Sequence, residues 1–211
     1  MSKEKNVLVA GANGTTGRII IDLLKKSETY SPIAMVRNQD QKDNFEKQNI
    51  ASIVADLKDD LSLVLKNVNK VIFAAGSKGK DVIGVDQEGA KRLTDAAKQA
   101  GVEKFVMLSS MGTENPSKSG DLEDFMIAKK NADDYLCASG LDYSIVRPGQ
   151  LTDTEGTGKI ELKERLETQG SISRADVAQT LVKVLEDDVK QNQVFEIIAG
   201  EVPIEEAVRT S

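Results

Sequence analysis

Three glycines near the start of the chain have the spacing and surroundings of a phosphate-binding turn. Gly11, Gly14 and Gly17 stand three residues apart, after the apolar run 7–10 and before the apolar-faced segment 18–24. In this setting the first glycine permits a tight turn, the second lets the backbone approach a ligand, and the third lets helix and strand pack closely. The start of the helix then directs unpaired N–H groups at a pyrophosphate. A turn that merely connects two elements is the alternative, which the surrounding pattern disfavours.

An arginine after the second apolar run indicates which dinucleotide would bind. NAD-preferring sites carry an acidic residue about 20 positions after the glycines, where it bonds the ribose 2′-hydroxyl. Here Arg37 and Asn38 occupy that place, and no carboxylate follows until Asp40. Because a guanidinium pairs well with a phosphate, we expect NADP as the cofactor. A solvated arginine at a strand end is the alternative.

The ends of the third and fourth apolar runs carry residues suited to the adenine, ribose and nicotinamide of a dinucleotide. Asp56 could bond an adenine amino group, and a turn-forming aspartate is the open alternative. Ala74, Ala75 and Gly76 are small residues, placed where a backbone would run close to the ribose and nicotinamide. Tight packing at a strand end is the alternative there.

The composition of the 211 residues limits the function classes. A net charge of −6 argues against nonspecific binding of nucleic acid or an anionic membrane, and no apolar run approaches the roughly 20 residues of a membrane span. The chain has no histidine, which excludes Ser-His-Asp chemistry and histidine-ligated metal sites, and we expect no metal. The single Cys137 cannot form an internal disulfide and is expected in the core. The N-terminus leaves no room for a signal peptide before the first strand, so we expect a cytoplasmic protein.

The elements that must position these residues alternate along the chain. Short apolar runs, typical of buried strands, are separated by segments whose apolar residues recur at helical spacing. This alternation predicts an α/β protein with a doubly wound, mostly parallel sheet and helices on both faces, in which ligands lie at the carboxyl ends of the strands. The expected strands are 7–10, 32–37, 50–55, 70–75, 104–110, 143–147 and 194–198, and the expected helices are 18–24, 39–48, 61–68, 86–99, 121–139 and one after 173.

The C-terminal part departs from this alternation. From residue 150 to 170 the pattern loosens into Thr, Gly and charged residues, with a short edge strand expected at 159–162. Ser173 and Asp176 have the spacing of a capping box ahead of another helix. We therefore expect one NAD(P)-binding domain over 1–211, with a small substrate-covering region at about 150–211.

The chain resembles the atypical short-chain dehydrogenase/reductases, in particular the biliverdin reductase B/flavin reductase type and the NmrA-like NADP-binding proteins. The resemblance rests on four motifs in the family's order: Gly-Ala-Asn-Gly-Thr-Thr-Gly at 11–17, Leu-Ser-Ser at 108–110, Ala-Lys at 128–129 and Arg-Pro-Gly at 147–149. It extends from Val7 to Ile198 and implies an NAD(P)-binding Rossmann fold.

The resemblance also implies a catalytic set with one member replaced. Most of the superfamily uses a serine and Tyr-x-x-x-Lys, in which the tyrosine is the proton donor and the lysine holds the nicotinamide ribose. The matching positions are Ser110, Phe125 and Lys129, and a phenylalanine cannot donate a proton. A strand-end serine and a solvated helix lysine are the alternatives for Ser110 and Lys129. The candidate cofactor-binding residues are Gly11, Asn13, Gly14, Thr15, Thr16, Gly17, Arg37, Asp56, Leu57, Ala74, Ala75, Gly76, Ser109, Lys129 and Pro148.

These features favour an NADPH-binding oxidoreductase, monomeric or homodimeric, that transfers hydride to a small acceptor such as a flavin, quinone or carbonyl compound. The missing tyrosine leaves a second hypothesis open, a non-catalytic NADP(H)-binding redox regulator. An isomerase or epimerase with tightly held NAD is a third, which Arg37 and the short C-terminal region disfavour.

Overall fold

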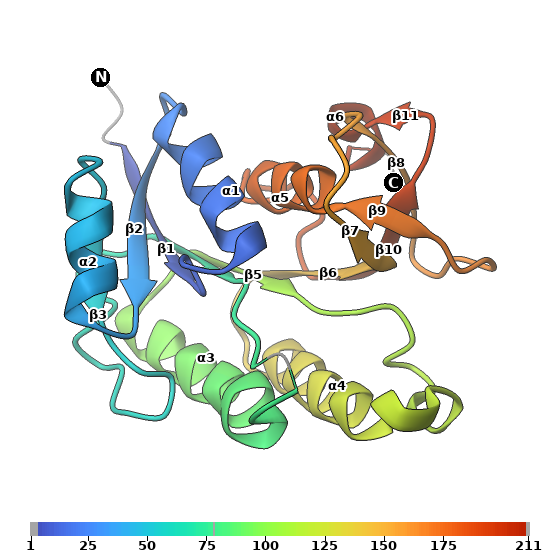
Figure 1. Cartoon of the computed structure of the whole chain (residues 1–211), viewed down its shortest axis with the longest axis horizontal. Coiled ribbons are helices and arrows are strands. Elements are labelled where there is room, and N and C mark those ends of the chain that lie inside the picture. The colour runs from blue at the N-terminus through green and yellow to red at the C-terminus, as the bar shows by residue number, and fades with distance from the viewer. Residues whose placement is uncertain (1–3, 78, 210–211) are drawn as a thin grey trace.

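The computed structural model describes residues 4–77 and 79–209. A large sheet organises them, with helices on both of its faces (Figure 1). Its strands are β1 (Lys5–Ala10), β2 (Tyr30–Val36), β3 (Ala51–Val54), β4 (Lys70–Phe73), β5 (Lys104–Leu108), β6 (Tyr143–Pro148), β8 (Lys159–Lys163), β10 (Gln193–Ala199) and β11 (Val202–Pro203), and a separate pair consists of β7 (Gln150–Thr152) and β9 (Ser171–Ser173). The helices are α1 (Thr15–Lys25), α2 (Gln39–Glu46), α3 (Glu88–Ala100), α4 (Glu123–Ala138), α5 (Arg174–Lys183) and α6 (Ile204–Ala207), together with a π-helix η1 (Val82–Gln87) and two 3₁₀ turns, η2 (Pro116–Lys118) and η3 (Gly120–Leu122).

The strand order is β11-β8-β10-β6-β5-β4-β1-β2-β3. From β1 the chain moves outward through β2 and β3, then crosses to the other side of β1 and continues through β4, β5 and β6. All of these neighbours run parallel, whereas β8 runs antiparallel to β10 and β11. The predicted doubly wound, mostly parallel sheet is therefore confirmed. The order in which the chain adds strands reverses between β1 and β4, although the two strands are parallel. Such sheets bind ligands at this point.

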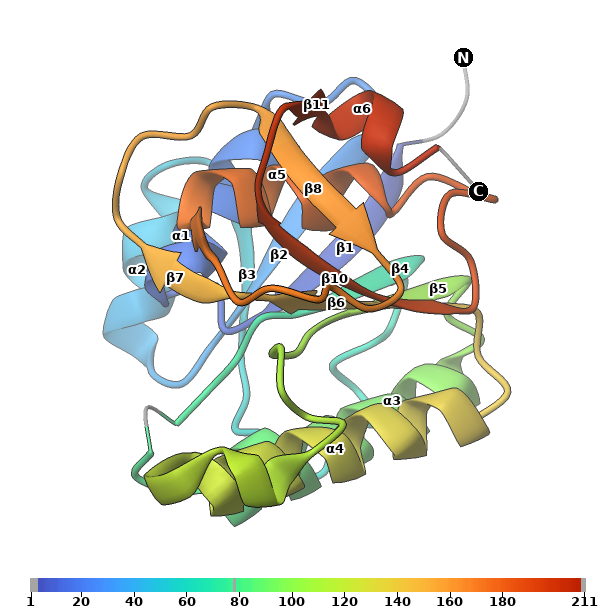
Figure 2. The ribbon, with the colours of Figure 1, turned by 90° about the vertical axis from the view of Figure 1, so that its right-hand side faces the viewer.

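Alternate side chains of the central strands supply two separate cores. Val9, Ile72 and Val106 pack on the face covered by α1 and α5, whereas Leu8 and Phe105 pack on the opposite face, covered by α3 and α4. Figure 2 shows these two helix layers on either side of the sheet. Since both faces are covered, the strands are apolar throughout, as parallel strands usually are.

Three sequence-based expectations about helices and the core need correction. The segment 61–68 forms turns instead of a helix: the N–H of Val64 donates to Leu61 O at 3.0 Å, and Asn67 has a φ of 62°. The helix is not propagated, although Leu61, Val64, Leu65 and Val68 are buried. The helix expected from 86 begins as the π-helix η1 and becomes α-helical only at Glu88. Cys137 is exposed, although the preceding residue on α4, Leu136, is buried, because successive residues of a helix lie about 100° apart around its axis.

Other local expectations are confirmed. Ser173 is the N-cap of α5, with Asp176 N–H donating to Ser173 Oγ at 2.9 Å, which is one of the two bonds of a capping box. Gly101 ends α3 with a φ of 70°, in the left-handed conformation typical of a residue after a helix. The strand expected at 159–162 is β8, but β11 pairs with it, so β8 is not the edge. No helix within the described ranges is long and apolar enough to cross a membrane; the cytoplasmic location stays a prediction.

Two buried lysines join the amino-end edge of the sheet to the turn after α5. Lys70 and Lys104 begin adjacent strands and are paired in register. The Lys70 ammonium contacts the Asp187 carboxylate, and Lys104 Nζ donates to the carbonyls of Glu186 and Val189 at 2.9 and 2.7 Å. Burial, together with the neighbouring Lys70 charge, lowers the pKa of Lys104 from 10.5 to about 8.

We expect this lysine to make stability depend on pH above about pH 8. Because the pKa of Lys104 is about 8 in the folded protein and 10.5, the ordinary value for lysine, in the unfolded chain, the unfolded chain binds more protons in this interval. The Lys104 contribution to stability therefore increases as pH rises through it. The variant Lys104→Met should show a smaller rise than the unaltered protein in urea midpoints measured at about pH 8, 9 and 10. Lys66→Met, which changes an exposed lysine, is the control. Equal slopes for the Lys104→Met variant and the unaltered protein would contradict the assignment.

Candidate functional site

The three-glycine turn has no room for side chains at its two outer positions. Gly11 has a φ of 86°, and a Cβ there would lie 2.6 Å from the backbone N of Ala75. A Cβ on Gly17 would lie 2.1 Å from Gly11 O, inside the strand-to-helix contact. Gly11 O also accepts a hydrogen bond from Gly14 N–H at 2.9 Å. The turn, the start of α1 and the segment after β4 therefore meet at Gly11.

The middle glycine borders open space at the start of α1. Apart from its chain neighbours, a Cβ on Gly14 would have one neighbour within 4 Å among residues 4–77 and 79–209, namely Gly11 O at 3.1 Å. Gly14 is the N-cap of α1 and supplies no side-chain hydrogen bond, so the first N–H groups of the helix, at Thr15 and Thr16, have no side-chain cap. Side chains cap α2 (Asn38) and α5 (Ser173), whereas α3, α4 and α6 begin without a side-chain cap, as α1 does. The open space at Gly14 is therefore what distinguishes the start of α1. An uncapped helix start beside open space is suited to an anion.

Two charged groups lie beside this turn. Arg18, in the first turns of α1, bonds back to the side chain of Asn13, and its guanidinium lies 5.9 Å from the centre of the Phe45 ring. Arg37 follows β2 and is exposed, and its guanidinium makes no hydrogen bond or ion pair with any residue in 4–77 or 79–209. Arg18 was not among the residues selected from the sequence, although its place directly after Gly17 was a signal.

After β3 and β4, the structure tests whether the residues form a turn and pack tightly, the alternatives to cofactor binding. Asp56 Oδ1 accepts a hydrogen bond from Lys58 N–H at 2.9 Å, so this aspartate forms a turn; its contact with adenine stays a prediction. Leu57 is buried, and its carbonyl accepts from Arg92 Nε at 2.7 Å. After β4, Ala74 and Ala75 are partly buried and border Gly11. These small residues thus serve tight packing, and they also lie at the reversal point of the sheet.

The two serines that follow β5 have different surroundings. Ser109 is buried and its Oγ donates to Asp133 on α4 at 2.7 Å; its role in cofactor binding stays a prediction. Ser110 is only partly buried, and its Oγ lies 3.1 Å from the carbonyl of Met111. Lys129 of α4 is 5% exposed, and its Nζ donates to the carbonyl of Leu108 at 2.8 Å. The structure therefore brings Lys129 to the end of β5, as the resemblance implies.

A buried ion network lies behind these residues. Arg147 of β6 donates from Nε to Asp133 at 3.0 Å and pairs at its other end with Glu114, in the loop after β5. Burial raises the pKa of Asp133, opposed chiefly by the Arg147 charge, and burial lowers the pKa of Lys129, opposed by Asp133 and Asp86. Asp133 was missed in the sequence, although a residue four positions after Lys129 shares its helix face.

The region after β6 is fastened to α5. Pro148 is buried, and its carbonyl accepts from Met111 N–H at 3.0 Å. The carboxylate of Asp176 accepts from the N–H groups of Thr157 and Gly158 at 3.1 and 2.7 Å. Gly149 meets the backbone so closely that a Cβ would lie 2.2 Å from Gly170 O. The segment 150–170 is therefore held in a defined position.

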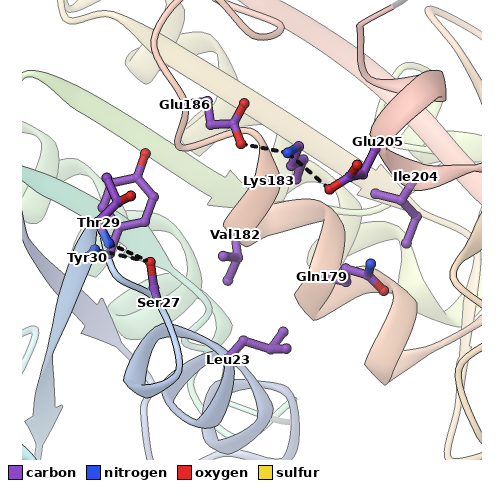
Figure 3. A pocket seen from close by; sticks show the side chains of 10 residues that line it. All are labelled: Leu23, Ser27, Thr29, Tyr30, Gln179, Val182, Lys183, Glu186, Ile204 and Glu205. Carbon is purple, nitrogen blue, oxygen red and sulfur yellow. Dashed lines mark hydrogen bonds and ion pairs between the residues drawn. The ribbon is translucent and has the colours of Figure 1, made fainter.

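A surface pocket of about 360 Å³ lies elsewhere, between α1, α5 and α6. Figure 3 shows Lys183 in this pocket, paired with Glu186 and Glu205, and Tyr30 at its side. Tyr30 begins β2, so the pocket is at the amino-end edge, opposite the glycine turn. The site is assigned to the carboxyl-end edge because the uncapped helix, the sheet reversal and Lys129 are there.

Comparison with known proteins identifies the class of protein. Residues 11–188 match the model of the NAD(P)H-binding family. The Bacillus subtilis (strain 168) protein named "Uncharacterized sugar epimerase YhfK" is 35% identical over 96% of this chain and 98% of its own. The Saccharomyces cerevisiae UPF0659 protein YMR090W is 30% identical, with 97% of each chain covered. A solved structure from Bacillus halodurans, described as a putative NAD-dependent epimerase/dehydratase, is 34% identical, covers 97% of this chain and 98% of its own, and has a TM-score of 0.92.

The fold and these matches define a nucleotide-binding protein with a Rossmann fold. The chain belongs to the NAD(P)H-binding family.

Two glycine variants should separate the folding role of the turn from its binding role. Gly14→Val should fold, because a Cβ there meets little, but its side chain would fill the space that a pyrophosphate needs, so NADPH and NADH binding should be lost. Gly17→Ala should lower the thermal midpoint, because its Cβ would lie 2.1 Å from Gly11 O. Nucleotide titrations and thermal melts check both, and a folded Gly14→Val variant that still binds NADPH would show that this turn is not the phosphate site.

Proposed function

We propose that this protein is an NADPH-dependent reductase of a small, planar acceptor such as a flavin or a quinone. The observation that carries the proposal is the uncapped start of α1 beside open space at Gly14, with Arg37 after the end of β2 and Lys129 at the end of β5. These residues fit a phosphorylated dinucleotide: backbone N–H groups for the pyrophosphate, a guanidinium without another partner for the 2′-phosphate, and an ammonium for the ribose.

Each of these groups has a distinct task. The N–H groups of Thr15 and Thr16 and the dipole of α1 would hold the pyrophosphate. An ammonium has three N–H donors, and the structure assigns one donor of Lys129 to Leu108 O, so two remain for the ribose hydroxyls. NADPH, when bound, supplies the hydride. Ser110 is partly exposed after β5, and its hydroxyl, which donates to the Met111 carbonyl at 3.1 Å, would turn to donate a hydrogen bond to an oxygen of the acceptor.

The acceptor class follows from what the site lacks. None of the three tyrosines is placed to donate a proton there: Tyr30 and Tyr143 begin strands at the amino-end edge, and Tyr135 Oη donates to Asp95 at 2.7 Å. Phe125 stands where a proton donor would be expected. Flavins and quinones can take their protons from water after hydride transfer, so the missing phenol does not exclude them.

Two other functions remain as alternatives. The absence of a proton donor favours a redox regulator that binds NADP(H) without turnover. The names of the two Bacillus relatives favour an epimerase. Arg37, suited to a 2′-phosphate, instead favours NADP over the tightly held NAD of that chemistry. We therefore place both below the reductase.

A panel of acceptors tests the function and the role of Phe125 together. We expect the purified protein to oxidise NADPH with flavins or quinones. Phe125→Tyr should gain reduction of aldehydes or ketones, because Lys129, four residues along α4, would lower the pKa of the new phenol. General acid catalysis contributes about 10²–10⁴-fold, so even an imperfectly aligned phenol should give a detectable gain. The measurement is the loss of NADPH absorbance.

The outcomes separate the hypotheses. Tight NADPH binding without turnover of any acceptor by either form would support the regulator and overturn the reductase. Unchanged carbonyl reduction by a Phe125→Tyr variant that binds NADPH normally would show that Ser110, residue 125 and Lys129 do not share a catalytic geometry.

The cofactor preference should depend on Arg37. A guanidinium–phosphate contact is worth roughly 1.5–3 kcal/mol, or about ten- to hundredfold in affinity. Arg37→Ala should therefore weaken NADPH binding by about this factor and leave NADH binding nearly unchanged. The control is Arg209→Ala, which removes a positive charge paired with Glu186, away from the site. Equal NADPH and NADH affinities in the unaltered protein would end the NADP assignment.

A further inference from the structure

Arg147 is a buried charge that the proposed reaction does not use. It is 5% exposed and lies near the end of β6. Its Nε donates to Asp133 Oδ2 on α4 at 3.0 Å, and its Nη1 pairs with the carboxylate of Glu114. Glu114 belongs to the loop that leaves β5 and runs to the start of α4 (Figure 1). One guanidinium therefore joins β6, α4 and this loop, and a charge so buried needs its partners.

Both partners of Arg147 lead to the same short segment, residues 109–114. Asp133 Oδ2 also accepts from Ser109 Oγ at 2.7 Å, so this carboxylate links Arg147 to the first residue of the segment. Glu114 is the last residue of the segment. The other oxygen, Asp133 Oδ1, is buried and has no hydrogen-bond partner in the described part of the chain. Asp133 thus uses one oxygen to connect Ser109 with Arg147.

The backbone of the segment follows the end of β6. Ser109 N–H donates to Val146 O at 2.8 Å, and Met111 N–H donates to Pro148 O at 3.0 Å. These two carbonyls belong to the residues on either side of Arg147 in the chain. The contacts of the guanidinium and those of the backbone therefore come from one stretch of β6 and hold one segment.

Ser110 lies between these fixed residues and has a side chain that can turn. The residue is only partly buried, and its Oγ donates to the carbonyl of the neighbouring Met111 at 3.1 Å. Because a hydroxyl can rotate to suit a partner, the positions that it reaches are set by the backbone that carries it. Holding this backbone therefore determines where Ser110 Oγ can meet a ligand.

We propose that Arg147 is a positioning residue for the hydride acceptor. By holding both ends of the segment 109–114, it places the Ser110 hydroxyl where an oxygen of the acceptor lies. This inference rests on the proposed function, because Ser110 must contact the acceptor. It deepens that function by giving the loop after β5 a charged anchor, whose loosening should change turnover of the acceptor and leave NADPH binding nearly unaltered.

The variant that tests this inference is Glu114→Ala. The Glu114 side chain is 46% exposed, and without it Arg147 keeps its bond to Asp133, so the variant should fold. Removal of Arg147 would instead leave Asp133 buried without its cation. The control is Asp134→Ala, which removes an exposed carboxylate of α4 that pairs with Lys130 at 2.9 Å, outside the network.

Amide hydrogen exchange in the nucleotide-free protein tests whether the segment is held. The Met111 N–H should exchange about tenfold faster in Glu114→Ala than in the unaltered protein, whereas Asp134→Ala should leave its rate unchanged. Exchange at the unaltered rate in Glu114→Ala would overturn the inference, because Arg147 would then not hold the segment through Glu114. This measurement requires neither nucleotide nor acceptor.

A double-mutant cycle tests the consequence for the acceptor, with riboflavin and menadione as probes. Glu114→Ala should lower kcat/KM by about tenfold, since misplacing a contact by about 1 Å can cost about 10²-fold. NADPH affinity should stay within about twofold, and Asp134→Ala should leave kcat/KM unchanged. In a Ser110→Ala background, Glu114→Ala should cost less than about twofold, because the hydroxyl that it positions is gone.

The outcomes separate this inference from the proposed function. An equal loss of kcat/KM with and without the Ser110 hydroxyl would show that Glu114 acts by another route, and would overturn this inference alone. A fall in NADPH affinity as large as the fall in kcat/KM would also overturn it. Absence of turnover of either probe by the unaltered protein would contradict the proposed function and the acceptor role of Ser110, whereas the exchange rates would still decide whether Arg147 holds the segment.

Discussion

The close approach of three backbone segments at Gly11 is the constraint on which the site depends. Gly11 O bonds Gly14 N–H, excludes a side chain at Gly17, and lies in a turn that touches Ala74 and Ala75. A Cβ would fit neither at Gly11, against Ala74 and Ala75, nor at Gly17, against Gly11 O. The start of α1 and the end of β4 are therefore held against the end of β1. The helix start, the open space at Gly14 and the reversal of the sheet are consequently in one place.

Buried charges divide into two groups with different uses. At the amino-end edge, Lys104 donates to two carbonyls, and Lys70 donates to a carbonyl and to Asp187, so these ammoniums fasten the turn after α5. At the carboxyl-end edge, Lys129 is equally buried but is assigned only the Leu108 carbonyl. Burying a charge costs free energy unless it is paired and hydrogen-bonded. A buried lysine with two spare donors at the carboxyl-end edge is therefore suited to binding, whereas Lys70 and Lys104, with two bonds each, are suited to structure.

Much of the fold could be predicted from the sequence because the signals were local. The apolar runs, the glycine turn, the capping box at Ser173 and the glycine after α3 each depend on nearby residues, and the structure has them. The turns at 61–68 were mistaken for a helix because burial alone can produce helical spacing. The antiparallel strands β8 and β11 depend on pairing with β10 and with each other, which local pattern does not specify.

The candidate site was predictable where a motif specified the backbone, and less so where side chains choose partners across the fold. Ser109 and Ser110 are adjacent and alike in sequence, yet only Ser109 meets Asp133. Arg147 stood within an apolar strand, a sign of a buried partner, but only the tertiary structure identifies Asp133 and Glu114.

The most direct measurement of the central claim is a crystal structure with NADP bound. The account predicts the pyrophosphate over Gly14, the 2′-phosphate at Arg37 and the nicotinamide ribose at Lys129; a nucleotide bound instead in the pocket beside Tyr30, or with its adenine at Lys129, would contradict it.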